Sequence, residues 1–344
     1  MAKRTMVWLL AAASLILVGG ILFAGVMMTL NWDFSRLATT KLVTNEYEIT
    51  QQYKDISIVT NSADIKVMPS ADGKTRVVCY EQENMKHDIT VIEEDGEALL
   101  KVWINDTRAW YEHVAINFKK PKIEVYIPQG EYGMLYTHSD TGNTKINDVS
   151  TFKKIEVVTS TGDVEMRVYA EQKIEIRGST GDVKLQGAAA EEIEIGTSTG
   201  KVNVYKVNYG ASLIVNVTTG KVDLREITGG DRPAEMMQCG FLVSRGNTGS
   251  IQLDDVVVDG HILIERSTGN VGFNKCDAEE IEVKTSTGNV RGRFLTKKCI
   301  IAQSKTGNVT APSYRDGNWC TITTTTGDIY IDVPVSFDDI NEWD

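Results

Sequence analysis

The chain has few of the residues that usually build catalytic, metal or nucleotide sites. Its 344 residues include only five cysteines and four histidines. The histidines, His87, His113, His138 and His261, show no ligand spacing, and none accompanies a plausible nucleophile. The glycines recur at long intervals and form no phosphate-binding loop. We therefore expect a protein that is not an enzyme and that uses no cofactor and no bound metal.

The cysteines do not predict a disulfide framework. Cys79, Cys239, Cys276, Cys299 and Cys320 stand at different positions relative to the sequence repeat described below. Residues on neighbouring strands bridge easily only when they share a register. We expect buried thiols that pack as small hydrophobic groups, with a Cys299–Cys320 bridge, one residue out of register, left open.

Basic residues are outnumbered by acidic ones, 36 against 47, which gives a net charge of −11. Such a chain does not neutralise phosphate groups well. The charge therefore argues against nucleic acid as a partner and against electrostatic attraction to anionic lipid.

Residues 6–30 form a long apolar run. These 25 residues carry no charge and would span roughly 37 Å as a helix, enough for the ~30 Å hydrocarbon core of a membrane. Lys3 and Arg4 precede the run, so we predict a signal anchor with residues 1–5 in the cytoplasm and the remaining chain outside the cell membrane. A cleaved signal peptide is the alternative, although no A-x-A cleavage site closes the run. Residues 31–45 would form a short stalk.

A Thr-Gly pair recurs ten times between short β-patterned runs. Successive glycines are 19 or 20 residues apart, with one interval of 29. A constant period near 20 is typical of a stacked repeat protein, in which each unit buries its apolar face on its neighbours. The pairs are Thr141-Gly142, Thr161-Gly162, Thr180-Gly181, Thr199-Gly200, Thr219-Gly220, Thr248-Gly249, Thr268-Gly269, Thr287-Gly288, Thr306-Gly307 and Thr326-Gly327.

Apolar residues alternate with polar ones on both sides of each pair. They stand seven and five residues before the glycine, two and four after it, and again seven after it. Around Gly181 these positions hold Ile174, Ile176, Val183, Leu185 and Ala188. This alternation indicates two half-buried strands per unit. We predict an all-β, parallel β-solenoid of about ten coils of 19–20 residues, with strands about 4.8 Å apart in two parallel sheets. Antiparallel hairpins closed into a sandwich or barrel are the alternative.

Each Thr-Gly corner is expected to have a structural role. Glycine reaches positive φ without a Cβ clash, and the Asp or Asn that usually follows it favours a turn. The threonine has the parity of the inward positions, so its hydroxyl can satisfy backbone groups at the bend. Lys201 and Lys221 replace the Asp or Asn in two consecutive units, which disfavours a cation site along the corners.

An N-terminal β cap over residues 46–133 is expected to cover the first coil. It contains a degenerate coil, in which Ala63 stands where the glycine should be, and a hairpin signal at Asp95-Gly96. Extra strands here would blunt the open end of the solenoid. The remaining segments are the repeats over 134–335, with a loop insertion at about 226–240, and an acidic tail over 336–344.

Three glutamates are the candidate binding residues. Glu156, Glu175 and Glu194 occupy the same outward position in three consecutive coils, roughly 5 Å apart. Like charges at this spacing would raise one another's pKa or attract a cation. A solvated face relieved by nearby basic residues is the other interpretation. Farther along, the same row becomes mostly apolar, which indicates a partner surface or a docking site for the inserted loop.

The repeated units resemble those of a bacterial family known as putative adhesins, whose function is unknown. The motifs that carry the resemblance are Ser160-Thr161-Gly162-Asp163-Val164, Ser179-Thr180-Gly181-Asp182-Val183 and Ser286-Thr287-Gly288-Asn289-Val290, with the opening segments Asn61-Ser62-Ala63-Asp64-Ile65 and Ile123-Glu124-Val125-Tyr126-Ile127-Pro128. The resemblance covers about residues 46–333. It implies a surface-exposed repeat protein of bacteria, with some members near cell-envelope stress systems. It transfers no catalytic or ligand residues.

These observations favour a membrane-anchored, extracytoplasmic β-solenoid that serves as a non-catalytic, adhesin-like interaction module. Its partner would be an envelope protein or a polysaccharide. A regulatory component of the envelope stress response is the alternative, and a carbohydrate-active enzyme that uses the stacked glutamates is a third hypothesis. The sequence leaves the ligand and the oligomeric state open.

Overall fold

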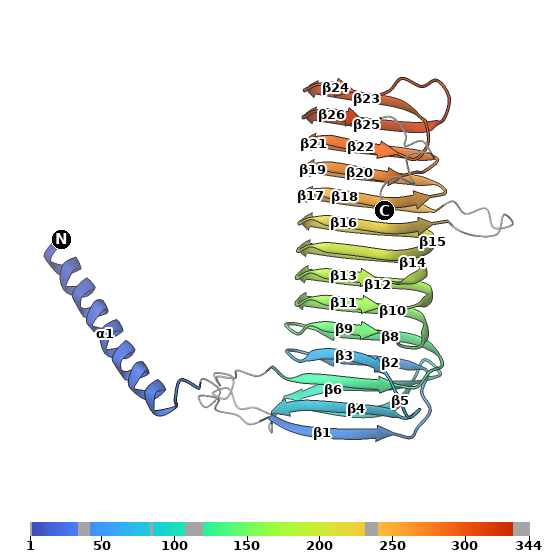
Figure 1. Cartoon of the computed structure of the whole chain (residues 1–344). Coiled ribbons are helices and arrows are strands. Elements are labelled where there is room, and N and C mark those ends of the chain that lie inside the picture. The colour runs from blue at the N-terminus through green and yellow to red at the C-terminus, as the bar shows by residue number, and fades with distance from the viewer. Residues whose placement is uncertain (1, 34–41, 83–84, 107–119, 231–239, 333–344) are drawn as a thin grey trace.

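The computed structural model describes residues 2–33, 42–82, 85–106, 120–230 and 240–332. One helix, α1 (Ala2–Thr29), precedes a parallel β-solenoid whose strands stack one above another (Figure 1). Consecutive coils pair in parallel and in register, which confirms the predicted fold class and excludes the array of antiparallel hairpins. The middle of the predicted stalk, most of the insertion with Cys239, and the acidic tail lie outside the described residues.

Each coil has one strand before its corner glycine and one after it, and we call the two stacks the pre-corner face and the post-corner face. The pre-corner strands are β8 (Glu131–Ser139), β10 (Thr151–Thr161), β12 (Ala170–Thr180), β14 (Ala189–Thr199), β17 (Phe241–Thr248), β19 (His261–Thr268), β21 (Glu280–Thr287), β23 (Lys298–Thr306) and β25 (Asn318–Thr326). The post-corner strands are β9 (Thr144–Asn147), β11 (Val164–Arg167), β13 (Val183–Gln186), β16 (Val222–Gly229), β18 (Ile251–Val258), β20 (Val271–Cys276), β22 (Val290–Phe294), β24 (Val309–Thr310) and β26 (Ile329–Ile331). The continuous strand β15 (Val202–Thr219) supplies the post-corner strand of one coil and the pre-corner strand of the next.

Similar apolar residues stack directly on one another inside the solenoid. Ile155, Ile174 and Ile193 are paired across β10, β12 and β14, and all three are fully buried. Burial of apolar surface contributes about 25 cal/mol per Å². The continuous apolar ladders are therefore the main source of stability, as the sequence period predicts.

A second bend, which the sequence pattern did not reveal, lies six residues after most corner glycines. The residues at this bend have left-handed φ angles between 48° and 60°, and they are Asp148, Gly187, Lys206, Glu226, Asp255 and Lys275. The bend turns the next residue inward, as at the buried Val207 and Ile227. The coil of Gly162 has no left-handed residue at this position. There Val168 is buried, and Tyr169, which we expected inside, is 54% exposed.

The last two coils do not stack in the order of the chain. β21 pairs with β25, and β25 pairs with β23, so the final coil lies between the two coils that precede it (Figure 1). The final coil buries Cys320, Ile322 and Ile329, each at most 1% exposed. The coil at the end has smaller inward residues such as Ala302, and its Val309 is 44% exposed. The coil with the weaker apolar face therefore takes the terminal position.

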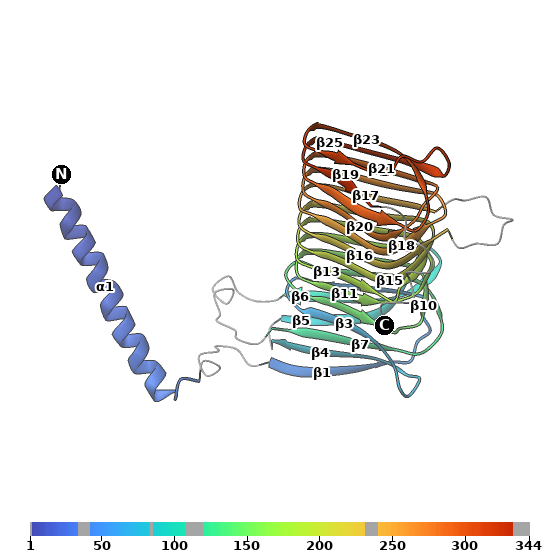
Figure 2. The same ribbon diagram turned by 45° about the horizontal axis from the view of Figure 1, so that its top comes forward.

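Antiparallel strands close the other end of the solenoid (Figure 2). The degenerate coil consists of β2 (Asp55–Thr60) and β3 (Asp64–Pro69), which pair in parallel with β8 and β9. Beyond it, β6 (Glu97–Asp106) and β7 (Lys122–Ile127) form one more parallel coil, which we did not foresee. The strands β1 (Leu42–Ile49), β4 (Thr75–Gln82) and β5 (Met85–Glu94) are antiparallel to their neighbours. Because β1 begins at Leu42, the last residues of the predicted stalk belong to the folded domain.

Candidate functional site

The corner glycines are required by the close approach of neighbouring coils. A Cβ atom on Gly200 would lie 1.9 Å from the carbonyl oxygen of Gly181 in the adjacent coil. The same contact, at 1.8 to 2.2 Å, occurs at all ten corner glycines, and the first of them meets Ala63 of the degenerate coil. Eight of the ten also have φ between 132° and 158°, a region that favours glycine. Crowding between coils, in addition to the expected bend, explains the recurrence of glycine.

The threonine before each corner glycine is exposed in all ten coils, contrary to the inward parity that we expected. The alternation stops three residues before the glycine, because the two residues that follow are on the outside of the bend. The residue at that position is buried in most coils, and in several coils it is a Ser or Thr that provides the hydroxyl that we assigned to the threonine. Ser304 Oγ donates to the carbonyl of Gly327 at 2.8 Å, and Thr324 Oγ1 donates to the carbonyl of Gly288 at 3.2 Å.

The Asp or Asn after the glycine forms a ladder of hydrogen bonds between coils. Asp163 Oδ1 accepts the backbone N–H of Asp182 at 2.9 Å, and Asp182 Oδ1 accepts that of Lys201 at 2.7 Å. Asn270 and Asn289 accept in the same way near the other end of the solenoid. These side chains satisfy backbone donors that the bend takes out of the strand ladder. The geometry therefore gives the corner carboxylates and amides a structural role.

Lys201 and Lys221 interrupt this ladder, because an ammonium group cannot accept a hydrogen bond. Both lysines instead approach Asp223, with Nζ to Oδ2 distances of 3.6 and 3.0 Å. Arg225 Nη2 lies 3.8 Å from the other oxygen of this carboxylate, Oδ1. Asp223 as a residue is only 4% exposed. Three cations thus compensate one buried carboxylate, and the group has little capacity left for a further cation.

The three candidate glutamates lie side by side, as the register predicts. Glu156 pairs with Glu175, and Glu175 pairs with Glu194, across β10, β12 and β14. Each carboxylate contacts a basic residue of its own or the next coil: the partners are Lys154, Lys173 and Arg177. Burial of Glu156 opposes its ionisation, but the ion pairs with Lys154 and Arg177 prevail and hold its pKa below the ordinary value. The local charges already balance, and binding of a ligand by these glutamates stays a prediction.

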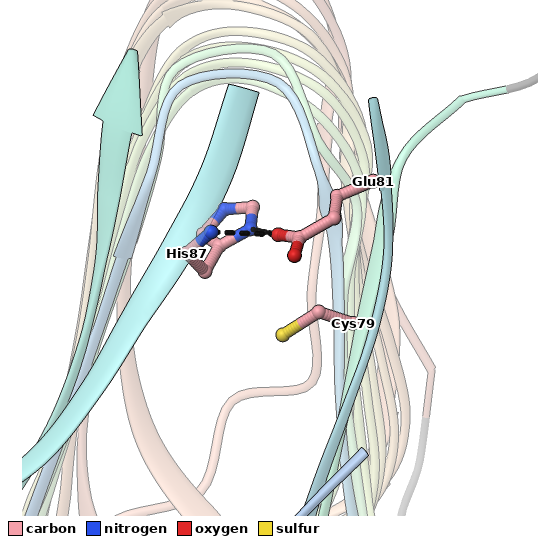
Figure 3. Close-up of side chains that lie close together, drawn as sticks. All are labelled: Cys79, Glu81 and His87. Atoms are coloured by element: carbon pink, nitrogen blue, oxygen red, sulfur yellow. Dashed lines mark hydrogen bonds and ion pairs between the residues drawn. The ribbon is translucent and has the colours of Figure 1, made fainter. Parts of the chain in front are cut away.

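A buried polar cluster in the cap was not found from the sequence. Cys79 and Glu81 project from β4 toward His87 on β5, and one ligand atom of each lies within 4.8 Å of the others (Figure 3). All three residues are at most 2% exposed. Because β4 and β5 meet at a corner between the two faces, the residues come together only in the folded cap. The sequence feature that could have indicated the cluster is the alternation in β4, which puts Cys79 and Glu81 on the same side of the strand.

The hydrogen bonds of this cluster are already made. Glu81 Oε2 accepts from His87 Nδ1 at 2.8 Å and from the His87 backbone at 2.6 Å, and Oε1 accepts from Asn45 at 2.6 Å. Burial opposes the ionisation of Glu81, but these donors outweigh it and lower its pKa. The other ring nitrogen, Nε2, lies 3.1 Å from Thr60 Oγ1. The residues therefore form a closed carboxylate–imidazole–hydroxyl chain inside the cap.

This chain has the order of groups found in a catalytic triad, and with Cys79 it contains donor atoms that zinc accepts. Thr60 is fully buried, however, so no substrate can reach its hydroxyl. Burial, together with the charge of Glu81, raises the pKa of the Cys79 thiol to about 12, which opposes the thiolate form that binds metals. The geometry fits a structural network that holds the β4–β5 corner better than a catalytic or metal site.

One buried cation also has no counter-charge among the described residues. Arg266 is 5% exposed, and Gly246 in the adjacent coil leaves the space for its guanidinium group. Its Nη2 donates to Ser244 Oγ at 2.8 Å, while Nε has no hydrogen-bond partner in the described part of the chain. Burial lowers the pKa of Arg266 to about 10. The residue occupies a position where six of the other nine coils have a Ser or Thr side chain.

The outer surface has hollows on both faces. On the pre-corner face, a hollow of about 620 Å³ lies over Gly178, Gly196 and Gly246. On the post-corner face, two hollows of about 330 and 470 Å³ share Arg291. We call the two hollows together the post-corner trough, and its lining includes Lys221, Gln252, Asn270, Asn289, Arg291, Asp328 and Tyr330.

The four described cysteines, Cys79, Cys276, Cys299 and Cys320, are free thiols. Cys320 is paired with Ile300, and Cys299 with Trp319, so the two thiols are one residue out of register and do not bridge. Burial raises the pKa of Cys276 and of Cys320 to about 12. These two thiols act as small hydrophobic side chains.

Comparison with known proteins places this solenoid in context. The Toastrack DUF4097 family model matches residues 53–232. The chain is similar to a "putative adhesin" from Bacteroides fragilis NCTC 9343, with 16% identity, 86% of this chain and 99% of that chain covered and a TM-score of 0.41. It is also similar to a "putative adhesin" from Parabacteroides distasonis ATCC 8503 (12% identity, 85% and 98% covered, TM-score 0.45) and to a "putative lipid binding protein" from the same strain (16%, 86% and 98%, 0.38). A search of curated proteins found no match.

Proposed function

This chain belongs to the Toastrack DUF4097 family, and we propose that it is a membrane-anchored, non-catalytic interaction module whose solenoid lies outside the cell membrane. The observation that supports this function is the combination of one apolar helix with a long solenoid that presents its outer faces. Met6–Thr29 is long and apolar enough, by length and composition, to cross a membrane. Lys3 and Arg4 precede it, which favours a cytoplasmic N-terminus.

The length of the solenoid suits a role in reaching a partner. Fourteen strands follow one another on the post-corner face, in the order β1, β4, β7, β3, β9, β11, β13, β15, β16, β18, β20, β22, β26 and β24. At about 4.8 Å per strand, this stack is roughly 60 Å long. β1 is the first strand after the anchor in the chain, and β24 lies at the opposite end of the stack.

The absence of catalysis is inferred from how the polar groups are used. The carboxylate–imidazole–hydroxyl chain of Glu81, His87 and Thr60 is closed to solvent. The stacked glutamates are compensated by basic residues at 2.8 to 3.7 Å or closer. Among the described residues, the carboxylate–imidazole–hydroxyl chain is buried and the stacked glutamates are paired, which favours a role in binding.

The orientation can be tested by labelling single cysteines in intact cells. In a chain in which Cys239 and Cys299 are replaced by serine, Thr219→Cys places a thiol at an exposed corner and Thr5→Cys places one before the anchor. A membrane-impermeant maleimide should label Thr219→Cys in intact cells and Thr5→Cys only after lysis. The reverse pattern would refute the proposed orientation. A mass of 38.0 kDa in the membrane fraction would show that the anchor is retained.

Interaction and regulation can be separated by the partner that is recovered. Full-length protein in detergent, tagged at its C-terminus, should retain an envelope polysaccharide or wall-associated protein. Recovery of a membrane signalling protein alone would support the envelope-stress alternative. Release of new reducing ends from envelope polysaccharides, abolished by Glu175→Gln, would contradict the non-catalytic assignment.

A further inference from the structure

The residues that line the post-corner trough belong mainly to β18, β20, β22, β24 and β26 and to the corners before them. These strands are near the end of the solenoid farthest from β1 (Figure 1). One outward side chain is missing along its first hollow. Three residues after the corner glycine, where N-terminal coils carry Lys145, Glu165 or Lys184, this region has Gly272. Gly272 pairs with Gln252 on one side and with Arg291 on the other. The Gln252 side chain lies over the glycine, because a Cβ there would be 2.0 Å from its Oε1 atom.

Two amide side chains on the edge of the trough are held in one orientation. Asn270 Oδ1 accepts the N–H of Asn289 at 2.9 Å, and Asn289 Oδ1 accepts the N–H of Asp328 at 2.8 Å. Since the oxygens are used in the corner ladder, the amino groups are left as donors. Within the described chain, neither Nδ2 group makes a hydrogen bond to protein. The trough therefore presents fixed, unpaired N–H groups on consecutive coils about 4.8 Å apart.

Positive charge and an aromatic ring also line the trough, together with the carboxylate of Asp328, whose Oδ1 accepts the backbone N–H of Asn308 at 2.9 Å. Arg291 lines both hollows, and it makes no ion pair with any described residue. Lys221, at the far end of the first hollow, contacts Asp223 at 3.0 Å. Tyr330 is the register neighbour of Arg291 and is 49% exposed. By contrast, the arginines of the pre-corner hollow, Arg177 and Arg245, are bound to glutamates at 2.9 Å or closer.

We propose that the post-corner trough binds an extended polysaccharide that carries carboxylate groups. The Arg291 guanidinium would bind a carboxylate through two parallel hydrogen bonds. The amino groups of Asn270 and Asn289 would donate to sugar hydroxyls, and the Tyr330 ring would pack against the apolar face of a sugar. Repetition of the donors along the solenoid axis matches a ligand that is itself a repeating chain. The inference rests on the proposed function and names the class of its partner.

The inference can be tested with two matched probes, oligomers of polygalacturonate and the same oligomers as methyl esters. Full-length protein in detergent is immobilised, and equilibrium binding of each probe is measured. The charged oligomers should bind and the esters should bind at least about tenfold more weakly, because the charge-assisted hydrogen bond to Arg291 is lost. Equal binding of the two probes, or binding of the esters alone, would overturn the proposal.

Two variants locate the site without disturbing the fold. Asn289→Asp keeps the oxygen that accepts the N–H of Asp328 but replaces the free donor by a negative charge. Asn289→Asp and Arg291→Gln should each reduce the affinity for polygalacturonate about tenfold or more. The matched control is Asn143→Asp, which makes the same change at a corner with the same hydrogen bond, outside the trough. If the control weakens binding as much as Asn289→Asp, the site is elsewhere and the proposal fails.

Failure of this inference can be distinguished from failure of the proposed function. If wild-type protein binds neither probe while Thr219→Cys is labelled in intact cells, the trough assignment is wrong and the interaction module stands. If Thr219→Cys is labelled only after lysis, the proposed function is wrong whatever the binding data show.

Discussion

Replacement of one corner glycine by alanine isolates the crowding between coils. The Cβ atom of Gly200→Ala would lie 1.9 Å from the Gly181 carbonyl oxygen and 2.7 Å from its carbon. Backbone atoms cannot rotate away, so the two coils must separate at this corner. Three hydrogen bonds hold them there, from Gly181 N to Thr199 O at 3.0 Å, from Val183 N to Lys201 O at 2.8 Å, and from Lys201 N to Asp182 Oδ1 at 2.7 Å.

The expected cost of Gly200→Ala follows from these contacts. Alanine at φ 149° costs about 1–3 kcal/mol of strain, and each hydrogen bond that is broken costs about 0.5–1.5 kcal/mol. The free energy of unfolding should therefore fall by at least about 3 kcal/mol. For a domain of this size, that loss lowers the melting temperature by at least about 6 °C.

The control for this experiment lies four residues earlier in the same coil. A Cβ on Gly196 meets no atom within 4 Å, and its φ is not in the left-handed range. Gly196→Ala should leave stability unchanged or raise it by about 0.4–1 kcal/mol, because alanine restricts the unfolded chain. Thermal unfolding of the full-length protein in detergent, followed by far-UV circular dichroism, compares the two variants. Equal melting temperatures for Gly200→Ala and Gly196→Ala would refute the crowding argument.

Four further predictions follow from the described contacts. Asp182→Ala should destabilise the protein by about 1 kcal/mol through loss of the acceptor for Lys201 N–H, whereas Asp182→Asn, which keeps Oδ1, should not; thermal unfolding tests both. Because the Glu156 pKa is below its ordinary value, its ion pairs stabilise the protein above about pH 4.5, and this contribution is lost as the pH falls through the lower folded-state pKa. Melting temperatures measured against pH should show a weaker acid dependence for Glu156→Gln, and an unchanged dependence would contradict the assignment. At pH 8 a thiol reagent should leave Cys79, Cys276 and Cys320 unmodified until unfolding, as site-specific mass spectrometry can show. Arg266→Met should raise the melting temperature, since it removes a buried cation without a described counter-charge; a clear decrease would indicate an unseen partner.

The repeat period was sufficient to predict the coils and most of their inward residues, because every coil must bury its own apolar stripe; Tyr169 and the corner threonines are the exceptions. Ile174 and Ile193 are identified by this pattern and lie where it places them. The period could not predict the order of the last two coils, since their strands offer the same corner geometry to any neighbour. The choice depends on a difference in apolar surface, such as Ile322 against Ala302, that appears only when the alternatives are compared in three dimensions.

The candidate site was less predictable than the fold. The second bend is occupied by residues as different as Lys206, Glu226 and Gly187, so no residue type marks it. Cys79 and His87 meet because two antiparallel strands turn a corner in the cap, where the repeat rule does not apply. The post-corner trough depends on Gly272, whose importance comes from its neighbours in other coils. Contacts between coils that differ in sequence cannot be predicted from the pattern within a single coil.

The exchanged positions of the final two coils mean that the order of assembly differs from the order of synthesis. Synthesis proceeds from the N-terminus and therefore completes β23 and β24 before β25 and β26. In the native structure β25 pairs with β21, and at this stage β25 has not been synthesised. The coil of β23 and β24 therefore either stays undocked or is displaced from β21 when β25 is made. A fragment that ends near residue 315 would lack β25, the strand that pairs with β21. The less apolar coil of β23 would then be the one available to pack against β21. Only a chain that includes β25 and β26 can reach the native arrangement, so correct closure of this end of the solenoid depends on the synthesis of both strands.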